Sequence, residues 1–370
     1  MQMSSFSSIN CRTLSTVQEK RRCMHAQVQE LKQTWLERLA FGPTRRDDAL
    51  IQLWLGVFPV SLNQLPLERA VLLQGQIDAI RRHLSGTYRD LLGAMLADPA
   101  LQISLSGHLN NRTNPNENLA RELLELFSLG EGHYTENDVI ETARALTGYR
   151  LVQHRSLVLD PRRHDFGTKT ILGRTSGFDL SELVQWLCQQ PATARHITRR
   201  LWLEIVGPLP SPARLEEIAA GWRQNHLSLP WLISVLERTP EARDGRRQAT
   251  RLDSPIAMVS RSLALLGSRH PDALRISIHH LRLMGQPLFA PPSVKGWPTN
   301  EEWLNLRWLT ARRRGLMALL ADPEVWASRE LPDSLPPGLT AIPPLTIGLP
   351  APATRENIAR LWRDPVWQLC

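Results

Sequence analysis

Three polar side chains recur at helical spacing in the segment 115–129. At 100° per residue, Asn118, Glu122 and Glu125 fall within a stripe of about 60°, while the leucines occupy the opposite arc. Two carboxylates one turn apart can bind a hard divalent cation or act as an acid and a base. The alternative is a solvated helix face on which Arg121 forms ion pairs with neighbouring glutamates.

A second group of chemically active residues follows in a loop. His164 and Asp165 place an imidazole beside a carboxylate, an arrangement suited to a base or a metal ligand. The alternative is a local turn held by a hydrogen bond. Lys169 is notable because 44 basic residues include only four lysines, and an ammonium differs from a guanidinium in reach and acidity.

These residues suggest an enzyme-like site, provided that the imidazole of His164 folds back against the acidic stripe. The candidate catalytic residues are Glu122, Glu125, His164, Asp165 and Lys169. The candidate substrate-binding residues are Asn118, Arg121, Arg144, Lys295 and Trp297. The candidate ligands for a divalent metal are Glu122, Glu125 and His164.

Each of the remaining candidates also has a structural interpretation. Arg144 fits a surface ion pair or a buried bridge to the acidic stripe, and the turn at 295–298 fits a ligand platform or a packed corner. His133, His196, His279 and His280 lack metal-ligand spacing and are interpreted as structural or surface residues. The sequence shows no Gly-rich phosphate loop, nucleophile elbow or paired-His zinc motif.

Composition restricts the class of protein. The net charge of +8 comes mostly from dispersed arginines, so nucleic-acid binding is not favoured. The four cysteines show no zinc or redox spacing and do not require a disulfide framework. No segment is apolar enough to span a membrane, and the first residues lack an apolar signal core, which predicts a cytoplasmic protein.

Helical periodicity and capping signals predict an all-α fold, a multi-helix orthogonal bundle with a small hairpin or irregular loop near 149–177. Helix starts are expected at Asn114-Pro115, Thr135, Asp179 and Ser254-Pro255, with a further helix after Asn300.

The predicted organisation is a loose tail (1–25), one helical domain (26–320), a Pro-rich extended segment (321–353) and a C-terminal helix and tail (354–370).

The string NPNENLARELLELFSLGEGHYTENDVIETARALTGY at 114–149 resembles the signature of the bacterial domain-of-unknown-function 1800 family. The likeness continues at 164–173, 191–195 and 289–297, so that it covers roughly 85–315. The resemblance implies a largely helical fold, and the family is often exported and without an established activity. The chain is expected to be a shortened and divergent member.

One departure concerns the helix that precedes the signature. Where the resemblance implies Asn and His, this chain has Gly56 and Val57, which puts any family activity that needs them in doubt. The first hypothesis is therefore a helical enzyme-like domain that depends on a metal or on acid–base groups. The alternative is a non-catalytic binding or assembly module that acts with a protein partner.

Overall fold

The computed structural model describes residues 11–66, 69–152, 156–248 and 251–369. Within these residues helices dominate, and the strands pair as three small two-stranded antiparallel sheets. The predicted all-α fold with a small hairpin near 149–177 is confirmed, and a second hairpin joins it there.

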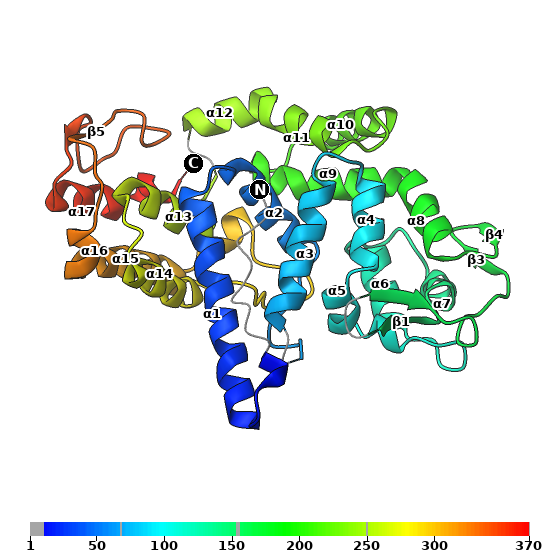
Figure 1. The fold of residues 1–370 in the computed structure, drawn as a ribbon. Coiled ribbons are helices and arrows are strands. Elements are labelled where there is room, and N and C mark those ends of the chain that lie inside the picture. The colour runs from blue at the N-terminus through cyan, green and yellow to red at the C-terminus, as the bar shows by residue number, and fades with distance from the viewer. Residues whose placement is uncertain (1–10, 67–68, 153–155, 249–250, 370) are drawn as a thin grey trace.

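The long elements form one elongated body (Figure 1). The first helices are α1 (Val17–Phe41), α2 (Arg45–Val57), α3 (Arg69–His83), α4 (Tyr88–Leu96), α5 (Pro99–Ser104), α6 (Glu117–Glu125) and α7 (Glu136–Ala145). Four strands follow, β1 (Tyr149–Val152), β2 (Ser156–Leu159), β3 (Lys169–Ile171) and β4 (Arg174–Ser176). The next helices are α8 (Leu180–Gln189), α9 (Pro191–Ile205), α10 (Pro212–Gln224), α11 (Leu229–Arg238), α12 (Pro240–Gln248), α13 (Pro255–Leu266), α14 (Pro271–Leu283), α15 (Leu306–Ala321) and α16 (Pro323–Ala327). The chain ends with β5 (Ser334–Leu335), β6 (Ala351–Pro352) and α17 (Arg355–Arg363).

Most helix starts follow the capping residues that the sequence predicts. Thr135, Asp179 and Ser254 each accept a hydrogen bond from a backbone N–H of the first turn. Two predictions are wrong by a few residues. The N-cap of α6 is Asn116 rather than Asn114, and α15 begins after Asn305.

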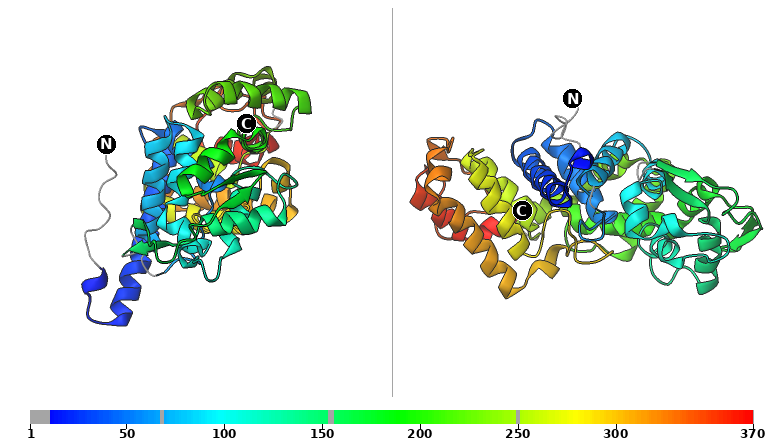
Figure 2. Two further views of the ribbon diagram at one scale, coloured as in Figure 1. Left: turned by 90° about the vertical axis from the view of Figure 1, so that its right-hand side faces the viewer. Right: turned by 60° about the horizontal axis from the view of Figure 1, so that its bottom comes forward.

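The predicted loose tail (1–25) is wrong for its last residues. A capping box formed by Thr16 and Glu19 begins α1 at Val17, and residues 1–10 lie outside the described part of the chain. A disulfide joins Cys11 to Cys23 and fixes a short 3-10 turn against this helix, although the spacing gave no reason to expect it. Figure 2 shows the N-terminal end of α1 extending beyond the rest of the body.

A row of buried aromatic rings joins α2 to α4 and α10. Trp54 of α2 and Phe58, the residue that caps its end, contact Tyr88 of α4, which in turn contacts Trp222 of α10. The hydroxyl of Tyr88 donates to the backbone oxygen of Phe127 at 2.6 Å, just after α6. Because a buried phenol needs a hydrogen-bond partner, this bond fixes the end of α6 against the core.

The segment 321–353 is less extended than its composition suggested. It begins with α16, and its later part forms a loop closed by the pairing of β5 with β6. The C-terminal helix predicted near 354–363 is present as α17, with Thr354 as its N-cap.

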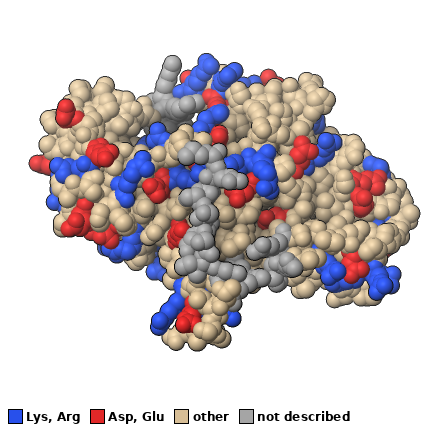
Figure 3. Space-filling view, viewed as in Figure 1, with Lys and Arg blue, Asp and Glu red and all other residues tan. Residues whose placement is uncertain are grey.

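In the view of Figure 3, Lys and Arg side chains lie among Asp and Glu side chains and do not gather into a single basic face. None of the helices in the described segments combines the length and the hydropathy that a bilayer crossing requires.

Candidate functional site

Arg144 holds the loop after β2 against α7. Its guanidinium donates to Asp165 at 2.8 Å and to both carboxylate oxygens of Glu141 at 2.9 Å. These charges raise the pKa of Arg144 and lower that of Asp165. Arg144 therefore forms a local ion-pair network rather than a bridge to the acidic stripe of α6.

His164 is buried in the same network. Its Nδ1 donates to the backbone oxygen of Thr147 at 2.7 Å, and its ring meets the edges of Tyr149 and Phe166. The backbone at Gly148 passes so close that a Cβ there would lie 2.7 Å from the backbone nitrogen of His164. These contacts support the local-turn interpretation of the His164–Asp165 pair.

Lys169 is also fully buried, with 1% of its surface exposed. Its ammonium donates to the backbone oxygens of Asp165 and Phe178, and burial lowers its pKa. The compact ammonium thus connects the loop to the start of α8, which gives this rare lysine a structural explanation.

The acidic stripe of α6 lies at a different place. Glu125 accepts a hydrogen bond from the hydroxyl of Tyr134 at 3.1 Å, and Lys295 Nζ lies 3.7 Å from its Oε1. Partial burial and the charge of Glu125 raise the pKa of Glu122. Arg121 pairs with Glu117 and Glu136 on the outer surface.

Asn118, the remaining residue of the predicted stripe, makes a local hydrogen bond. Asn118 donates to the backbone oxygen of Leu105 at 3.2 Å. The four buried residues of α6 are Leu119, Ala120, Leu123 and Leu124, as the helical periodicity predicts.

The contacts of His164 and those of the acidic stripe involve different elements. His164 is held by Thr147, whereas Glu122 and Glu125 face Lys295. Within the described residues, no three His, Cys, Asp or Glu side chains come together in a way that could hold a metal ion. The predicted metal ligands Glu122, Glu125 and His164 therefore do not form a joint site, because the loop packs on α7 and not on α6.

Helix α9 carries a polar stripe with the spacing i, i+4, i+8. His196 Nε2 donates to the backbone oxygen of Leu126, at the end of α6, at 3.2 Å. One turn later, Arg200 donates to the backbone oxygens of Gly56 and Lys295. Glu204 comes one turn further and lines a cavity. The stripe thus leads from the end of the signature helix to a recess lined by both apolar and polar side chains.

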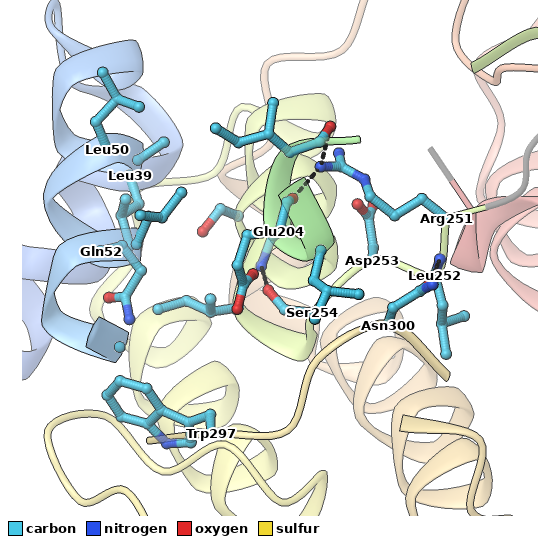
Figure 4. A pocket seen from close by; sticks show the side chains of 18 of the residues that line it. Leu39, Leu50, Gln52, Glu204, Arg251, Leu252, Asp253, Ser254, Trp297 and Asn300 are labelled. Atoms are coloured by element: carbon cyan, nitrogen blue, oxygen red, sulfur yellow. Dashed lines mark hydrogen bonds between the residues drawn. The ribbon is translucent and has the colours of Figure 1, made fainter. Parts of the chain in front are cut away.

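This recess, called the central pocket below, has a volume of about 910 Å³. It lies between α1, α2, α9, the start of α13 and the loop 297–303. In Figure 4, Leu39, Leu50 and Gln52 lie on one side of the pocket, and Arg251, Asp253 and Asn300 lie on the other. A pocket of this size and mixed lining has the dimensions of a small-molecule site.

Glu204 is the most unusual group in the central pocket. Within the described residues, its carboxyl makes no hydrogen bond or salt bridge. Burial raises its pKa, and Glu302 raises it further, while the nearby charges of Arg200 and Arg251 oppose this shift. A half-buried, unpaired carboxyl that lines a cavity is a candidate acid or base.

Backbone contacts build the wall opposite α2. Arg251 donates to the backbone oxygens of Glu204 and Ile205, which are the last carbonyls of α9. Asn300 accepts a hydrogen bond from the Leu252 N–H at 3.1 Å, and Asp253 pairs with Arg261 at 3.0 Å.

Two of the sequence-predicted positions meet the central pocket. Trp297 lines it, and so does Gly56, one of the two departures from the family pattern. A Cβ at Gly56 would lie 4.0 Å from Cε3 of Trp297, and Val57 is fully buried beside it.

Sequence reasoning missed Glu204, Arg200, Arg251, Gln286 and Asn300 as site residues. The spacing of His196, Arg200 and Glu204 was the available signal, because residues four apart share one face of a helix. Arg251, Gln286 and Asn300 come from separate segments that only the tertiary fold brings together.

The close contact at Gly148 predicts a specific loss of stability. Gly148→Ala combines a left-handed backbone (φ +82°) with a clash against His164, and should lower the free energy of unfolding by about 3 kcal/mol or more. Gly173→Ala has a similar φ (+75°) but open space around the new Cβ, so we expect only about 1–2 kcal/mol. Equal losses in urea titrations of the two variants would contradict this packing.

Burial of His196 predicts a pH dependence. Burial lowers the pKa of His196 to about 4, below its unfolded value of 6.5, so the unfolded state binds a proton that the folded state does not. The free energy of unfolding should therefore fall by about 2 kcal/mol as the pH drops from 6.5 to 4. His196→Gln should flatten this part of the profile, and the exposed His25→Gln should leave it unchanged.

Comparison with known proteins gives a family but no characterised relative. No curated protein and no solved structure matches the chain. The family model described as "Protein of unknown function (DUF1800)" matches residues 2–364. The match extends well beyond the range of 85–315 over which the resemblance was expected. The expectation that the chain is a shortened member of the family is therefore wrong. The chain belongs to the DUF1800 family of proteins of unknown function.

Proposed function

We propose that this protein is a small-molecule-binding, enzyme-like domain in which Glu204 exchanges a proton with a ligand in the central pocket. The observation that carries the proposal is the unpaired, half-buried carboxyl of Glu204, which lines a cavity of about 910 Å³. A carboxyl whose pKa is raised by burial can give or take a proton closer to neutral pH than an exposed one. This site replaces the one hypothesised at Glu122, Glu125 and His164.

The signature region has a positioning role in this proposal. The end of α6 is bound by His196, and Glu125 holds Lys295 in the loop that leads to Trp297. The ion pair between Lys295 and Glu125 is largely exposed and adds little stability, so the loop depends mainly on Arg200. The signature region therefore contacts His196 directly, and it contacts Arg200 indirectly through the loop at Lys295.

A substrate-independent test uses 5-nitrobenzisoxazole, whose carbon-bound proton is removed by a desolvated carboxylate as its ring N–O bond breaks. The base takes the proton, and the electron pair leaves on the phenolate oxygen, so the reaction needs no further reagent. The wild-type chain should convert 5-nitrobenzisoxazole faster than free acetate does. Glu204→Gln should lower the protein-catalysed rate about 100-fold. The rate should rise with pH through a pKa above the ordinary range for Glu, because the carboxylate is the active form.

Glu122→Gln is the matched control, since burial also raises the pKa of this carboxyl but it lies outside the central pocket. It should keep the wild-type rate. A wild-type rate equal to that of acetate, or an unchanged rate in Glu204→Gln, would refute proton exchange at Glu204.

We also propose that the chain works in an oxidising compartment instead of the cytoplasm expected from its sequence. The support is the disulfide between Cys11 and Cys23, because such bonds form and persist mainly in oxidising surroundings. Rapid thiol trapping in the source cells, followed by non-reducing peptide mapping, should recover the two cysteines in one linked species. Recovery of both as alkylated thiols would contradict the proposal.

A further inference from the structure

The central pocket has one apolar wall. Leu39 of α1 and Ala49, Leu50 and Leu53 of α2 line this side, where Figure 4 shows Leu39 and Leu50 facing the cavity. Apolar surface that lines an open cavity gains free energy when a ligand covers it. This wall therefore favours a ligand with an apolar body.

The opposite wall presents hydrogen-bond donors. Gln286 uses its side-chain oxygen to accept from the Ile256 N–H at 2.8 Å, and Asn300 uses its oxygen to accept from the Leu252 N–H. Both side chains are at least nine-tenths buried, and within the described residues their amide nitrogens have no hydrogen-bond partner. The indole nitrogen of Trp297 is likewise buried without a partner.

Amide nitrogens of pocket-lining residues that have no protein partner can donate to an acceptor-rich ligand. The fixed oxygen positions matter here. Because each amide oxygen already accepts a backbone N–H, neither amide can turn round to offer its oxygen instead of its nitrogen without losing that bond. These two amides can therefore satisfy acceptors such as carboxylate oxygens, and not donors.

The charged residues of the pocket lining also favour an anionic ligand. The pocket lining contains five arginines (Arg45, Arg46, Arg200, Arg251 and Arg261) and three acids (Glu204, Glu237 and Asp253). Two arginines are neutralised in ion pairs, Arg46 with Glu237 and Arg261 with Asp253. Among the described residues, Arg200 donates only to backbone oxygens, and no carboxylate forms an ion pair with it.

Helix α13 adds a weaker contribution at the same wall. It has 12 residues, it begins at Pro255, and Ser254 and Ile256 of its first turn line the pocket. The positive end of the helix dipole thus lies on the side of the amide donors, which favours a negative head group there.

We propose that the central pocket binds an amphiphilic anion, with its apolar body against α1 and α2 and its anionic head group on the amides of Gln286 and Asn300. The proposal rests on the proposed function, because it names the ligand class of the same pocket. It extends that function by predicting that Glu204 takes up a proton when the anion binds.

The proton uptake follows from the charges that surround Glu204. Arg200 on the same helix and Arg251 on the facing segment favour its ionised form, whereas Glu302 opposes it. An added anion opposes ionisation further, so binding and protonation reinforce each other. Once protonated, Glu204 would face the ligand as an acid.

Decanoate is the probe, titrated into the full chain by calorimetry, with decanol and decyltrimethylammonium as neutral and cationic ligands of equal length. Decanoate should bind about tenfold or more tightly than either, because only its head group offers the donors a negative charge and two acceptor oxygens. Acetate, which lacks the apolar body, should bind far more weakly than decanoate. Equal binding of decanoate and decanol, or no binding of decanoate, would overturn the proposal.

Near-isosteric variants test the position of the head group. Gln286→Glu and Asn300→Asp keep the oxygens that accept the backbone N–H groups but replace the donors with negative charge, so each should weaken decanoate about tenfold or more. Gln52→Glu is the matched control on the opposite wall, where the Gln52 oxygen accepts from Trp35 Nε1 at 2.8 Å. An equal loss in Gln52→Glu would contradict the assigned orientation.

Titrations in two buffers of different ionisation enthalpy measure the protons taken up. The wild-type chain should bind protons together with decanoate near neutral pH, while Glu204→Gln should bind decanoate without them. Proton uptake that persists in Glu204→Gln would overturn the coupling. If decanoate binds as predicted but 5-nitrobenzisoxazole is not converted, the ligand class stands and the catalytic role of Glu204 falls.

Discussion

The half-buried guanidinium of Arg200 makes the contacts on which the arrangement of the central pocket depends. It donates to the backbone oxygens of Gly56 in α2 and Lys295 in the loop before α15, and so joins three segments that are remote in sequence. The loop can approach α2 this closely because Gly296 has no side chain; a Cβ there would lie 2.4 Å from the Gly56 oxygen. Burial lowers the pKa of Arg200, which shows that the contact has a desolvation cost that its two carbonyl partners offset.

Helix α9 links the end of the signature helix to the central pocket. Its start touches the end of the signature helix through His196, and its end presents Glu204 to the pocket. The signature itself is a packing unit, in which Arg144, His164 and Lys169 are satisfied by their own loop and by α7. Local networks of this kind define a unique structure without requiring catalysis.

Much of the fold could be predicted from the sequence, because helix starts are encoded locally. Thr135, Asp179 and Ser254 each provide a cap within three residues of the N–H that they bind. The predicted site failed for the opposite reason. Whether His164 packs on α6 or α7 is decided by long-range contacts such as its bond to Thr147, and Gln286, Asn300 and Glu204 meet only through the tertiary fold.

The disulfide between Cys11 and Cys23 was missed for a related reason: its spacing of 12 residues carries no motif, and only the turn before α1 brings the sulfurs together.

The most direct test of the pocket's role is a crystal structure of the full chain with decanoate bound. The head group should lie within hydrogen-bonding distance of the amide nitrogens of Gln286 and Asn300, with the alkyl chain along Leu39 and Leu50. Decanoate bound beside Glu122 and Glu125, with the central pocket filled by rearranged side chains, would contradict this account.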